Sequence, residues 1–210
     1  KGLVEDLTHL WDKYKSDYPA GIRTAFTTDG RAYGFPVMVD YWAVFYNKAI
    51  FKKYQLSPPE TWEELMHIAD TLKNNAITPF GSTVQGGWTT FIWFEEMIIG
   101  QDPQLYNDLV IGKAKYTDMR VKKAFLAWKK LIDGGYMSNP ATDLFADMPR
   151  LFNTNKMGMI LAGTWYPGAV LNPAGVPDEN IGYFILPSHN PAAGKNVIFE
   201  AGPIFVSKNS

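Results

Sequence analysis

The sequence predicts an α/β fold, because segments with the composition of strands alternate with segments of helical periodicity. Residues 33–45 are rich in β-branched and aromatic side chains, as strands are, and the Asp-Gly pair at residues 29–30 favours a tight hairpin turn before them. Residues 62–74 repeat apolar side chains at helical spacing. Thr61 is a good cap for that helix, and Glu64 stands where a capping box needs an acid. A hairpin, a long strand and a capped helix are therefore expected.

An amphipathic helix is expected near the N-terminus, because five apolar residues share one helical face: Leu3, Leu7, Leu10, Trp11 and Tyr14. Asn47 is a good N-cap for a short helix that runs to Tyr54. Residues 88–99 are apolar on nearly all sides, which predicts a buried helix with Gly100 as its C-cap. Three aromatic residues of that helix are expected in the core: Phe91, Trp93 and Phe94.

Two further helices are expected at residues 102–111 and, after the capping residue Asp118, at residues 119–133. One apolar stripe is predicted on the longer helix: Val121, Phe125, Trp128, Leu131 and Ile132. Its lysines form a solvated face rather than a patch for nucleic acid, because no aromatic residues alternate with them. A loop at residues 138–143 leads to a helix that ends near residue 152.

Short strands complete the predicted fold. Residues 157–161 form a short apolar run that is expected to be a buried strand, and residues 162–168 turn into another helix. Residues 181–186 and 197–206 are the remaining strands, and the second is interrupted at residues 200–203 by Glu-Ala-Gly-Pro.

Composition places the chain among ordinary globular proteins. It has 210 residues, of which 46% are hydrophobic and 20% charged, so it can bury a sizeable core. A net charge of −1 gives no electrostatic reason to expect nucleic acid or an anionic membrane surface as a partner. The absence of cysteine excludes disulfides and thiol chemistry. No apolar run approaches the ~20 residues that a membrane-spanning helix needs.

Two residues are unusual for their surroundings. Asp40 is a single acid within an apolar strand, and an ionised carboxylate is rarely buried without partners, so it either meets an internal donor or faces an open cleft. Trp88 follows the glycine pair at residues 86–87, where a backbone can approach a ligand closely. For Trp88, ligand contact and a place in the core are equal alternatives.

Aromatic residues make up 15% of the chain. A large core with amphipathic rings at its rim explains most of them. A sugar-binding protein also needs exposed flat rings, because the C–H face of a pyranose packs well against an indole. The aromatic content is therefore compatible with a sugar site without proving one.

The sequence contains none of the common catalytic motifs. It lacks a Gly-x-Ser-x-Gly elbow, a phosphate-binding loop, a dinucleotide glycine motif and a His-Glu-x-x-His pair. The histidines are far apart in the sequence and none has the spacing of a zinc ligand: His9, His67 and His189. We therefore predict no metal and no cofactor. A pair of carboxylates could serve a glycosidase, and Asp40 and Glu200 remain candidates for that role.

Three motifs in order resemble a known family: DGRAYGFP at residues 29–36, FYNK at 45–48 and PPETWEEL at 58–65. They look like the carbohydrate-binding, maltose-binding-protein-like group of bacterial extracellular solute-binding proteins, which are receptors of ABC importers. Residues 151–165 are similar to that family's pattern of a helix end, a strand and a Gly-x-Trp turn. The resemblance implies an α/β, periplasmic-binding-protein-like (type II) two-lobe fold.

The resemblance also suggests how the chain divides. Members of the family are longer, and this chain begins with Lys1 rather than Met, so it is interpreted as an internal segment. Residues 1–40 would be the remainder of the first lobe and a hinge strand. Residues 41–202 would form the second lobe, and residues 203–210 the return crossing towards the first.

The ligand site that the resemblance implies combines an acid beside the hinge, Asp40, with aromatic platforms and Glu200 of the second lobe. In the family, the aromatic residue of the Gly-x-Trp turn is a sugar platform, which points to Trp165, although that side chain could also simply fill the turn. Glu200 could equally be a solvent-facing acid on an edge strand. The full set of ligand-binding candidates is Asp40, Tyr41, Trp88, Phe145, Trp165, Tyr166, Glu200 and Gly202.

The resemblance implies a non-enzymatic substrate-binding subunit of a bacterial ABC importer. It would close about a hinge on a mono- or oligosaccharide, without a cofactor, and deliver the sugar to the permease subunits. It would act as a monomer outside the cytoplasm, in the periplasm or as a cell-surface lipoprotein. A glycoside hydrolase or other sugar-active enzyme that uses Asp40 and Glu200 is the alternative.

Overall fold

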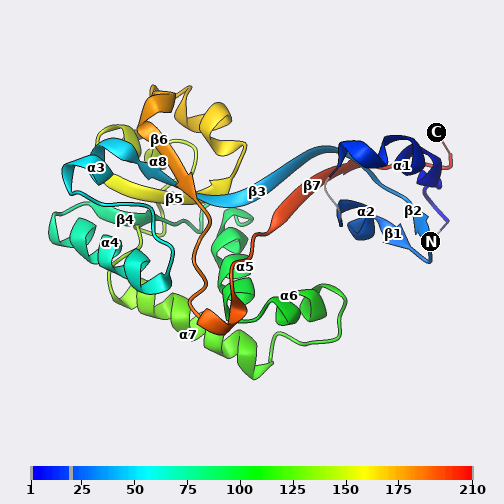
Figure 1. Ribbon diagram of the computed structural model, residues 1–210, viewed down its shortest axis with the longest axis horizontal. Helices are drawn as coiled ribbons and strands as arrows, with labels where there is room; N and C mark the ends of the chain where they lie inside the picture. Colours follow the sequence, from blue (N-terminus) through cyan, green and yellow to red (C-terminus); the bar gives the residue numbers. More distant parts are fainter. Residues whose placement is uncertain (1, 19–20, 210) are drawn as a thin grey trace. The chain divides into compact units, whose positions relative to one another are not determined.

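The computed structural model describes residues 2–18 and 21–209 (Figure 1). The chain forms two compact units. One consists of Lys1–Asp40 and Phe199–Ser210, and the other of Tyr41–Ile198. Whether these units correspond to parts of two lobes remains a prediction.

The first unit combines short helices, a hairpin and a strand pair. Its helical elements are α1 (Thr8–Tyr14), η1 (Lys15–Asp17) and α2 (Ile22–Ala25). Its strands are β1 (Thr27–Thr28), β2 (Arg31–Ala32) and β7 (Phe199–Ile204), which pairs with β3 (Phe35–Asn47). Its small core contains Trp11, Ile22 and Ala32. The indole N–H of Trp11 donates to the Gly34 carbonyl at 2.8 Å, which ties α1 to the segment before β3.

The predicted hairpin is confirmed in this unit. β1 and β2 pair antiparallel, and the turn between them has φ of +52° at Asp29 and +77° at Gly30. The predicted first helix is wrong at its beginning, because it starts only at Thr8 and Leu3 is 72% exposed. Residues before it are extended instead, since Val4 forms an antiparallel bridge with Ser207.

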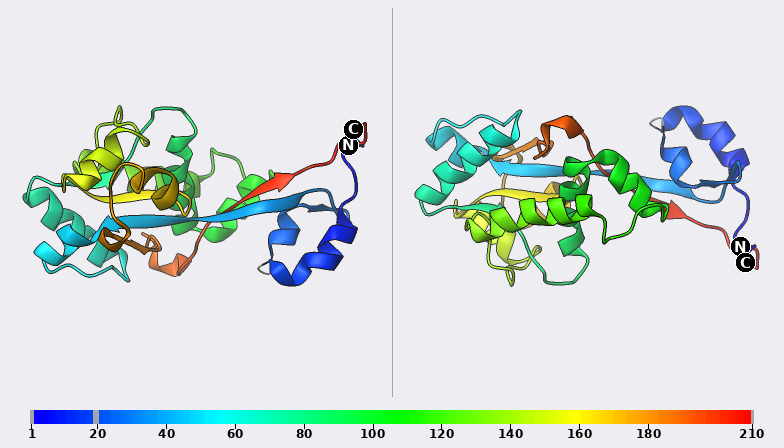
Figure 2. Two further views of the ribbon diagram at one scale, coloured as in Figure 1. Left: turned by 90° about the horizontal axis from the view of Figure 1, so that it is seen from above. Right: turned by 90° about the horizontal axis from the view of Figure 1, so that it is seen from below.

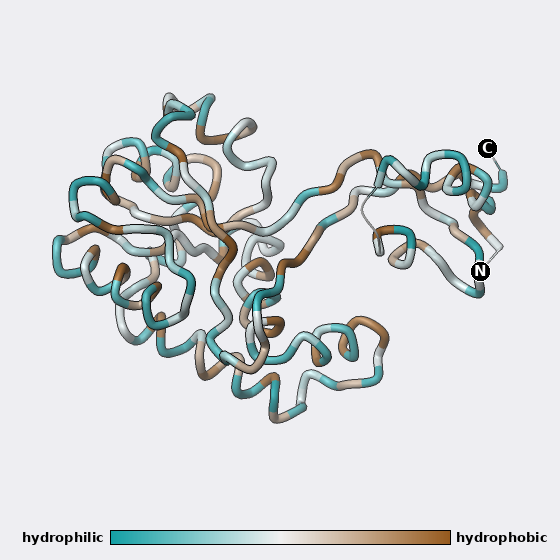
Figure 3. The backbone as a smooth tube through the Cα atoms, viewed as in Figure 1, coloured by the Kyte–Doolittle hydropathy of each residue, from teal (hydrophilic) through white to brown (hydrophobic). Residues whose placement is uncertain are grey.

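The second unit is built on a mixed sheet with the strand order β4-β5-β3-β6. β4 (Thr78–Gly81) lies parallel to β5 (Met157–Gly163), and β3 runs antiparallel to both β5 and β6 (Ile181–Phe184). β5 lies beside β3 in both views of Figure 2. Every residue of β5 is buried, and the hydrophobic colouring gathers on these strands in Figure 3.

Helices cover both faces of this sheet. Alternate residues of β5 point to opposite faces, so Met159 and Leu161 join one core cluster whereas Ile160 and Ala162 join another. The first cluster includes residues of α3 (Lys48–Lys53), α4 (Trp62–Asn74), α5 (Thr89–Gln101), α6 (Pro103–Val110) and α7 (Met119–Asp133). The second includes α8 (Asp147–Asn153) and the π-helical segment η2 (Pro167–Leu171). Short 3₁₀ turns lie at η3 (Asp178–Asn180) and η4 (Pro191–Ala193).

The predicted caps at the N-terminal ends of three helices are confirmed. Thr61 and Glu64 form a complete capping box at the start of α4. The Asn47 side chain accepts from the Ile50 N–H at 3.0 Å, and its amide donates to the Phe152 carbonyl at 2.9 Å. Asp118 caps α7 by accepting from the Arg120 N–H at 2.8 Å. Local capping chemistry therefore sets where these helices begin.

Two predicted burial patterns are wrong. On α7, Phe125 and Ile132 are 48% and 52% exposed, and Ala124 is buried in the stripe instead. The ring of Phe125 contacts that of Phe94 on α5, with centroids 5.1 Å apart. It therefore packs at the rim of the interface between α5 and α7 rather than inside it. On α5, Phe91 is 36% exposed and Phe94 is half-buried, whereas Trp93 is in the core as predicted.

Gly100 is not the C-cap of α5, because the helix continues to Gln101. A Cβ at Gly100 would lie 3.2 Å from Nδ1 of His189, so the glycine makes room for that ring. The cap is Asp102, which also caps α6 by accepting from the Gln104 N–H at 2.9 Å. Within the described chain, no helix is long and apolar enough to cross a membrane.

Candidate functional site

Four aromatic side chains of the second unit meet and form what we call the aromatic cluster: Trp88, Phe91, Phe145 and Trp165. The ring centroid of Trp88 lies 6.1 Å from those of Phe91 and Phe145 and 6.2 Å from that of Trp165. Trp88, Phe91 and Phe145 keep 42%, 36% and 49% of their surface exposed, and Trp165 is half-buried. The cluster is therefore an apolar surface open to solvent, of the kind that marks binding sites.

Two glycines precede Trp88, the ring that contacts the other three members of the cluster. Gly86 and Gly87 have φ of +77° and +74°, a region that side chains other than glycine rarely adopt. The Gly86 carbonyl accepts from the Trp88 N–H at 2.9 Å, and α5 begins at the next residue. Phe91 follows three positions after Trp88, the spacing that puts two side chains on one side of a helix.

A third glycine gives Trp165 its place after β5. A Cβ at Gly163 would lie 2.6 Å from Cδ1 of Trp165 and 2.9 Å from the ring of Trp42, so no larger residue fits there without displacing a ring. The main chain of the turn is tied to β3, because the Thr164 N–H donates to the Tyr41 carbonyl at 2.9 Å. The Tyr41 N–H donates in turn to Oγ1 of Thr164 at 3.2 Å. The indole of Trp165 therefore lies over a fixed backbone.

Phe145 comes from the loop before α8. Oδ1 of Asp143 accepts from the backbone N–H groups of Phe145 and Ala146, both at 2.8 Å, which holds the loop in a turn. The ring of Phe145 stacks on Trp165, with 17° between their planes and 6.1 Å between centroids. This contact joins two segments that are distant in the sequence.

Two buried aromatic residues support the cluster from below. Trp42 is 2% exposed, its ring centroid is 6.1 Å from that of Phe91, and its indole N–H donates to Oε2 of Glu95 at 3.1 Å. Tyr166 is fully buried and packs edge-on against Trp165 at 5.7 Å. Its hydroxyl donates to the Leu144 carbonyl at 2.6 Å, and burial raises its pKa, so it stays protonated.

Two neighbouring acids lie on α5, Glu95 and Glu96. Glu95 accepts from Trp42 and, at 3.4 Å, from the hydroxyl of Tyr106. Glu96 is 4% exposed, and Oε1 of its carboxyl has no hydrogen-bond partner among the residues described. Burial, followed by the charge of Glu95, raises the pKa of Glu96 to about 8, so this carboxyl is mostly protonated at neutral pH.

A sequence profile of the family described as bacterial extracellular solute-binding protein matches residues 1–210. The chain belongs to this family. The resemblance and the α/β fold predicted from the motifs are thus confirmed.

Relatives of this solute-binding protein agree with the assignment. An uncharacterized ABC transporter extracellular-binding protein of Pyrococcus horikoshii is 29% identical over a 216-residue alignment that covers 90% of this chain and 48% of that protein. The osmoprotective compounds-binding protein GgtB of Synechocystis is 26% identical over a 224-residue alignment that covers 98% of this chain and 49% of that protein. The solved structure of a chitin oligosaccharide binding protein is 27% identical to this chain and superimposes with a TM-score of 0.82. The match covers 99% of this chain and 53% of the chain of that structure. The chain spans about half the length of the curated relatives it matches.

The structure of this family member brings several predicted site residues together. Trp88, Phe145 and Trp165 meet in the aromatic cluster, and the backbone of Tyr41 is bonded to the same turn. Tyr166 is adjacent but lies beneath Trp165, with no exposed surface. Their role in binding remains a prediction.

Two members of this arrangement, Phe91 and Trp42, were not predicted from the sequence. Phe91 was expected in the core, and the signal that could have found it is its three-residue spacing from Trp88. Trp42 carried no separate signal, because a tryptophan within a strand is commonly a core residue.

The other predicted site residues belong to the first unit. Asp40 is half-buried and Glu200 is exposed. A Cβ at Gly202 would lie 2.8 Å from Cγ of Met38, so the glycine lets β7 approach that side chain. For these three residues, a part in ligand binding also remains a prediction.

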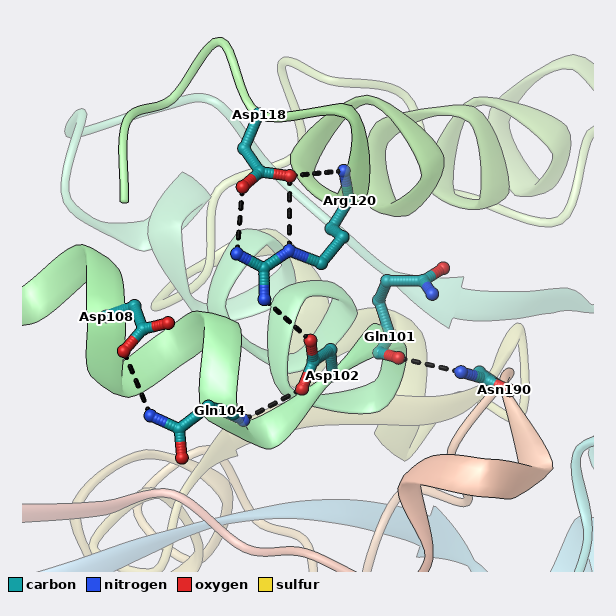
Figure 4. Close-up of polar contacts among 7 residues, drawn as sticks. All are labelled: Gln101, Asp102, Gln104, Asp108, Asp118, Arg120 and Asn190. Atoms are coloured by element: carbon teal, nitrogen blue, oxygen red, sulfur yellow. Dashed lines mark hydrogen bonds and ion pairs between the residues drawn. The ribbon is translucent and has the colours of Figure 1, made fainter. Parts of the chain in front are cut away.

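A pocket of about 220 Å³ lies where α5, α6 and α7 approach the η4 turn, and it is lined in part by Arg120, Asp102 and Asn190. Figure 4 shows the guanidinium of Arg120 held by two acids. It donates to Asp118 at 2.8 and 3.1 Å and to Oδ2 of Asp102 at 2.9 Å. Hydrogen bonds from Arg120 lower the pKa of Asp118 to about 2. Arg120 thus joins two acids at the place where α5 ends and where α6 and α7 begin.

A second pocket, of about 410 Å³, lies between the start of α4 and the loop before η4. Trp62 and His189 form part of its wall and pack edge-on with centroids 5.7 Å apart. Lys195 and Glu60 form an exposed ion pair beside them. Neither pocket contains a member of the aromatic cluster. Among the described residues, no three or more His, Cys, Asp or Glu side chains gather in a way that could hold a metal ion.

Proposed function

We propose that this chain is the ligand-binding part of a sugar receptor of a bacterial ABC importer. The observation that carries the proposal is the aromatic cluster. Its exposed rings come from separate loops and from helix α5, meet beside the turn after β5 and rest on buried aromatic residues. Such rings suit the C–H faces of pyranoses, whose burial against an indole is favourable.

The binding mode that we propose needs no chemical change in the sugar. Trp165 and Trp88 would cover apolar faces of the ligand, and Asp40 and Glu200 would accept hydrogen bonds from its hydroxyls. Closure about a hinge would bring these groups around the ligand, as in other two-domain binding proteins. Family membership supports this mode, because the functional names among the relatives are those of binding proteins.

A glycosidase that uses Asp40 and Glu200 is the less favoured function. It would require these two carboxyl groups to flank a scissile bond with one of them acting as an acid. The family to which the chain belongs supports binding instead. We further propose that the complete protein acts outside the cytoplasm as a monomer and delivers its ligand to permease subunits. The name of the Pyrococcus horikoshii relative, an ABC transporter extracellular-binding protein, supports that partnership.

The test is a titration of the complete gene product with a panel of neutral sugars, followed by tryptophan fluorescence and by chromatography of the recovered sugar. We expect saturable binding, with the sugar recovered unchanged. Trp165→Ala should weaken binding by at least about tenfold, because it removes the stacking surface. Phe125→Ala, which removes an exposed ring outside the cluster, is the matched control.

Two results would overturn the proposal. Release of shorter sugars from the panel would favour the hydrolase. Equal binding by wild type and Trp165→Ala would mean that the aromatic cluster is not the site.

A further inference from the structure

We propose that Glu95 is a positioning residue for the aromatic cluster: with Tyr106, it fixes the buried indole of Trp42 that supports the exposed rings. The inference rests on the proposed function and names a residue that acts through its neighbours without touching the sugar. Oε2 of Glu95 accepts from the indole N–H of Trp42 at 3.1 Å, and Oε1 accepts from the Tyr106 hydroxyl at 3.4 Å. One carboxylate therefore links β3, α5 and α6.

Trp42 contacts two parts of the cluster. Its ring centroid lies 6.1 Å from that of Phe91, and in the sheet it stands directly opposite Gly163. A Cβ at Gly163 would lie 2.9 Å from Cζ3 of Trp42 and 2.6 Å from Cδ1 of Trp165, so both indoles lie against the same glycine. A rotation of the Trp42 ring would therefore disturb Phe91 and Trp165 together.

The bond to Glu95 determines how the Trp42 ring is oriented. Trp42 is 2% exposed, and a buried indole N–H that loses its acceptor has no water to replace it. A carboxylate is also a stronger acceptor than a neutral oxygen. Because the N–H group lies on one edge of the indole, keeping this bond selects one orientation of the whole ring.

Tyr106 holds the carboxylate from α6. Burial, followed by the charge of Glu95, raises the pKa of Tyr106, so its hydroxyl keeps the proton that it donates to Glu95. The same charge contributes, after burial, to the raised pKa of Glu96, the next residue on α5. Two donors from different elements thus converge on one charged acceptor, and a network of this kind is rigid.

A fixed support favours ligand binding. Phe91 is 36% exposed, so the buried ring beneath it does much to hold it in place. Rings that are already in position lose less conformational freedom when a ligand arrives, and that difference appears as affinity. Glu95 therefore contributes to affinity although it makes no contact with the sugar.

The test measures sugar affinity of the complete gene product by isothermal titration calorimetry. The probes are glucose, galactose, xylose, N-acetylglucosamine, maltose and raffinose, and the tightest-binding sugar is used for every variant. Glu95→Leu removes both acceptor oxygens at similar side-chain size and should raise the Kd by about tenfold. Glu95→Gln keeps an oxygen that can accept from Trp42, so its Kd should stay within about threefold of wild type.

A matched pair of tyrosine variants tests the second bond of the carboxylate. Tyr106→Phe should raise the Kd by about twofold, because a bond of 3.4 Å is long and therefore weak. Tyr136→Phe is the control, since it also removes a hydroxyl that donates to an acid, here Asp70 at 2.7 Å. Tyr136 contacts no ring of the cluster, so its variant should bind sugar as wild type does.

A spectroscopic measurement separates positioning from general packing. In a ¹H–¹⁵N spectrum of the ligand-free protein, Trp42 gives one indole N–H signal, which Trp42→Phe identifies by its disappearance. Glu95→Leu should shift this signal and speed its exchange with deuterium, whereas Glu95→Gln should keep the exchange slow. In the Trp42→Phe background, Glu95→Leu should cost little further affinity, because the contact through which it acts is already lost.

Three results would overturn the inference and leave the receptor function standing. They are equal sugar affinity of Glu95→Leu and wild type, an indole signal of Trp42 that does not change in Glu95→Leu, and an equally large loss of affinity in the Trp42→Phe background. If wild type binds no sugar of the panel, the proposed function itself fails, and the positioning role fails with it.

Discussion

The second unit has two exposed groups of aromatic side chains, and they differ in how they are built. The aromatic cluster draws its rings from the loop before α5, from α5, from the loop before α8 and from the turn after β5. The other group lies on α5, on α7 and on the connection between α6 and α7: Phe94, Tyr116, Phe125 and Trp128. Its exposed members, Tyr116 at 69% and Phe125 at 48%, are as open to solvent as those of the cluster.

Exposure alone therefore does not identify a ligand site. The cluster is distinguished by loops that converge beyond the end of a buried strand, by glycines that let rings approach the backbone and by a buried layer beneath. The second group follows from two helices packing against each other, with rings left at the rim. α5 contributes to both groups, because Phe91 and Phe94 project from neighbouring parts of its surface.

The largest expected effect is on the free energy of unfolding. It arises from Glu96 on α5, the helix that contributes residues to both groups. The folded state holds the proton of Glu96 up to about pH 8, whereas the unfolded chain releases it near the ordinary value of 4.5. Between these pH values unfolding releases a proton, so the free energy of unfolding falls by up to about 1.4 kcal/mol per pH unit as pH rises. Glu96→Gln removes this titration. Denaturant unfolding at several pH values from 5 to 8 should show wild type losing stability relative to the variant, and parallel curves would contradict the buried-acid explanation.

The next prediction tests the glycine beneath Trp165. Gly163→Ala places a methyl group inside contact distance of Trp165 and Trp42, so we expect about 1–3 kcal/mol of lost stability and weaker sugar binding. Gly168→Ala is the matched control, because a Cβ there would meet no atom within 4 Å. Thermal unfolding and sugar titration of both variants provide the comparison. Equal behaviour of the pair would show that the turn tolerates a displaced indole.

A smaller effect is expected at the capping box of α4, which contains no member of either aromatic group. Thr61→Ala removes the acceptor for the Glu64 N–H, and such losses cost about 1 kcal/mol. The midpoint of urea unfolding should fall accordingly, while affinity for sugar stays unchanged. A loss of affinity as large as that of Trp165→Ala would mean that binding depends on overall stability rather than on the cluster.

The smallest effect is expected in the second aromatic group. Phe125 is half exposed, so Phe125→Ala should cost less than about 1 kcal/mol and should alter sugar affinity by less than twofold. Chemical denaturation and calorimetry measure the two quantities. A large drop in affinity would remove the distinction between the groups and extend the site along α5.

Sequence reasoning succeeded where the determining interactions are local. Asn47, Thr61 and Asp118 cap their helices through side chains that bond within three residues, so composition and spacing are enough to find them. The Asp29-Gly30 turn was predictable for the same reason, since it depends on the dihedral preferences of two residues.

Prediction from the sequence failed where contacts between residues far apart in the chain decide which side chains are buried. The periodicity of α7 gives Phe125 and Ala124 similar places near the buried face, and only the packing of α5 decides that the smaller residue goes inside. Phe91 looked like core for a related reason, because an apolar helix does not reveal which part of it lacks a covering partner. The convergence of Trp88 with Trp165 was expected only from the family resemblance, and no spacing in the sequence measures it.

β5 has a further consequence for how the second unit loses its structure. All of its residues are buried, and it is hydrogen-bonded to β4 on one side and β3 on the other. Backbone amides in such a position exchange with deuterium only when the whole domain unfolds, so β5 should be the slowest-exchanging segment. The turn that carries Trp165 emerges from this strand, which means that the platform is anchored to the last part of the unit to open.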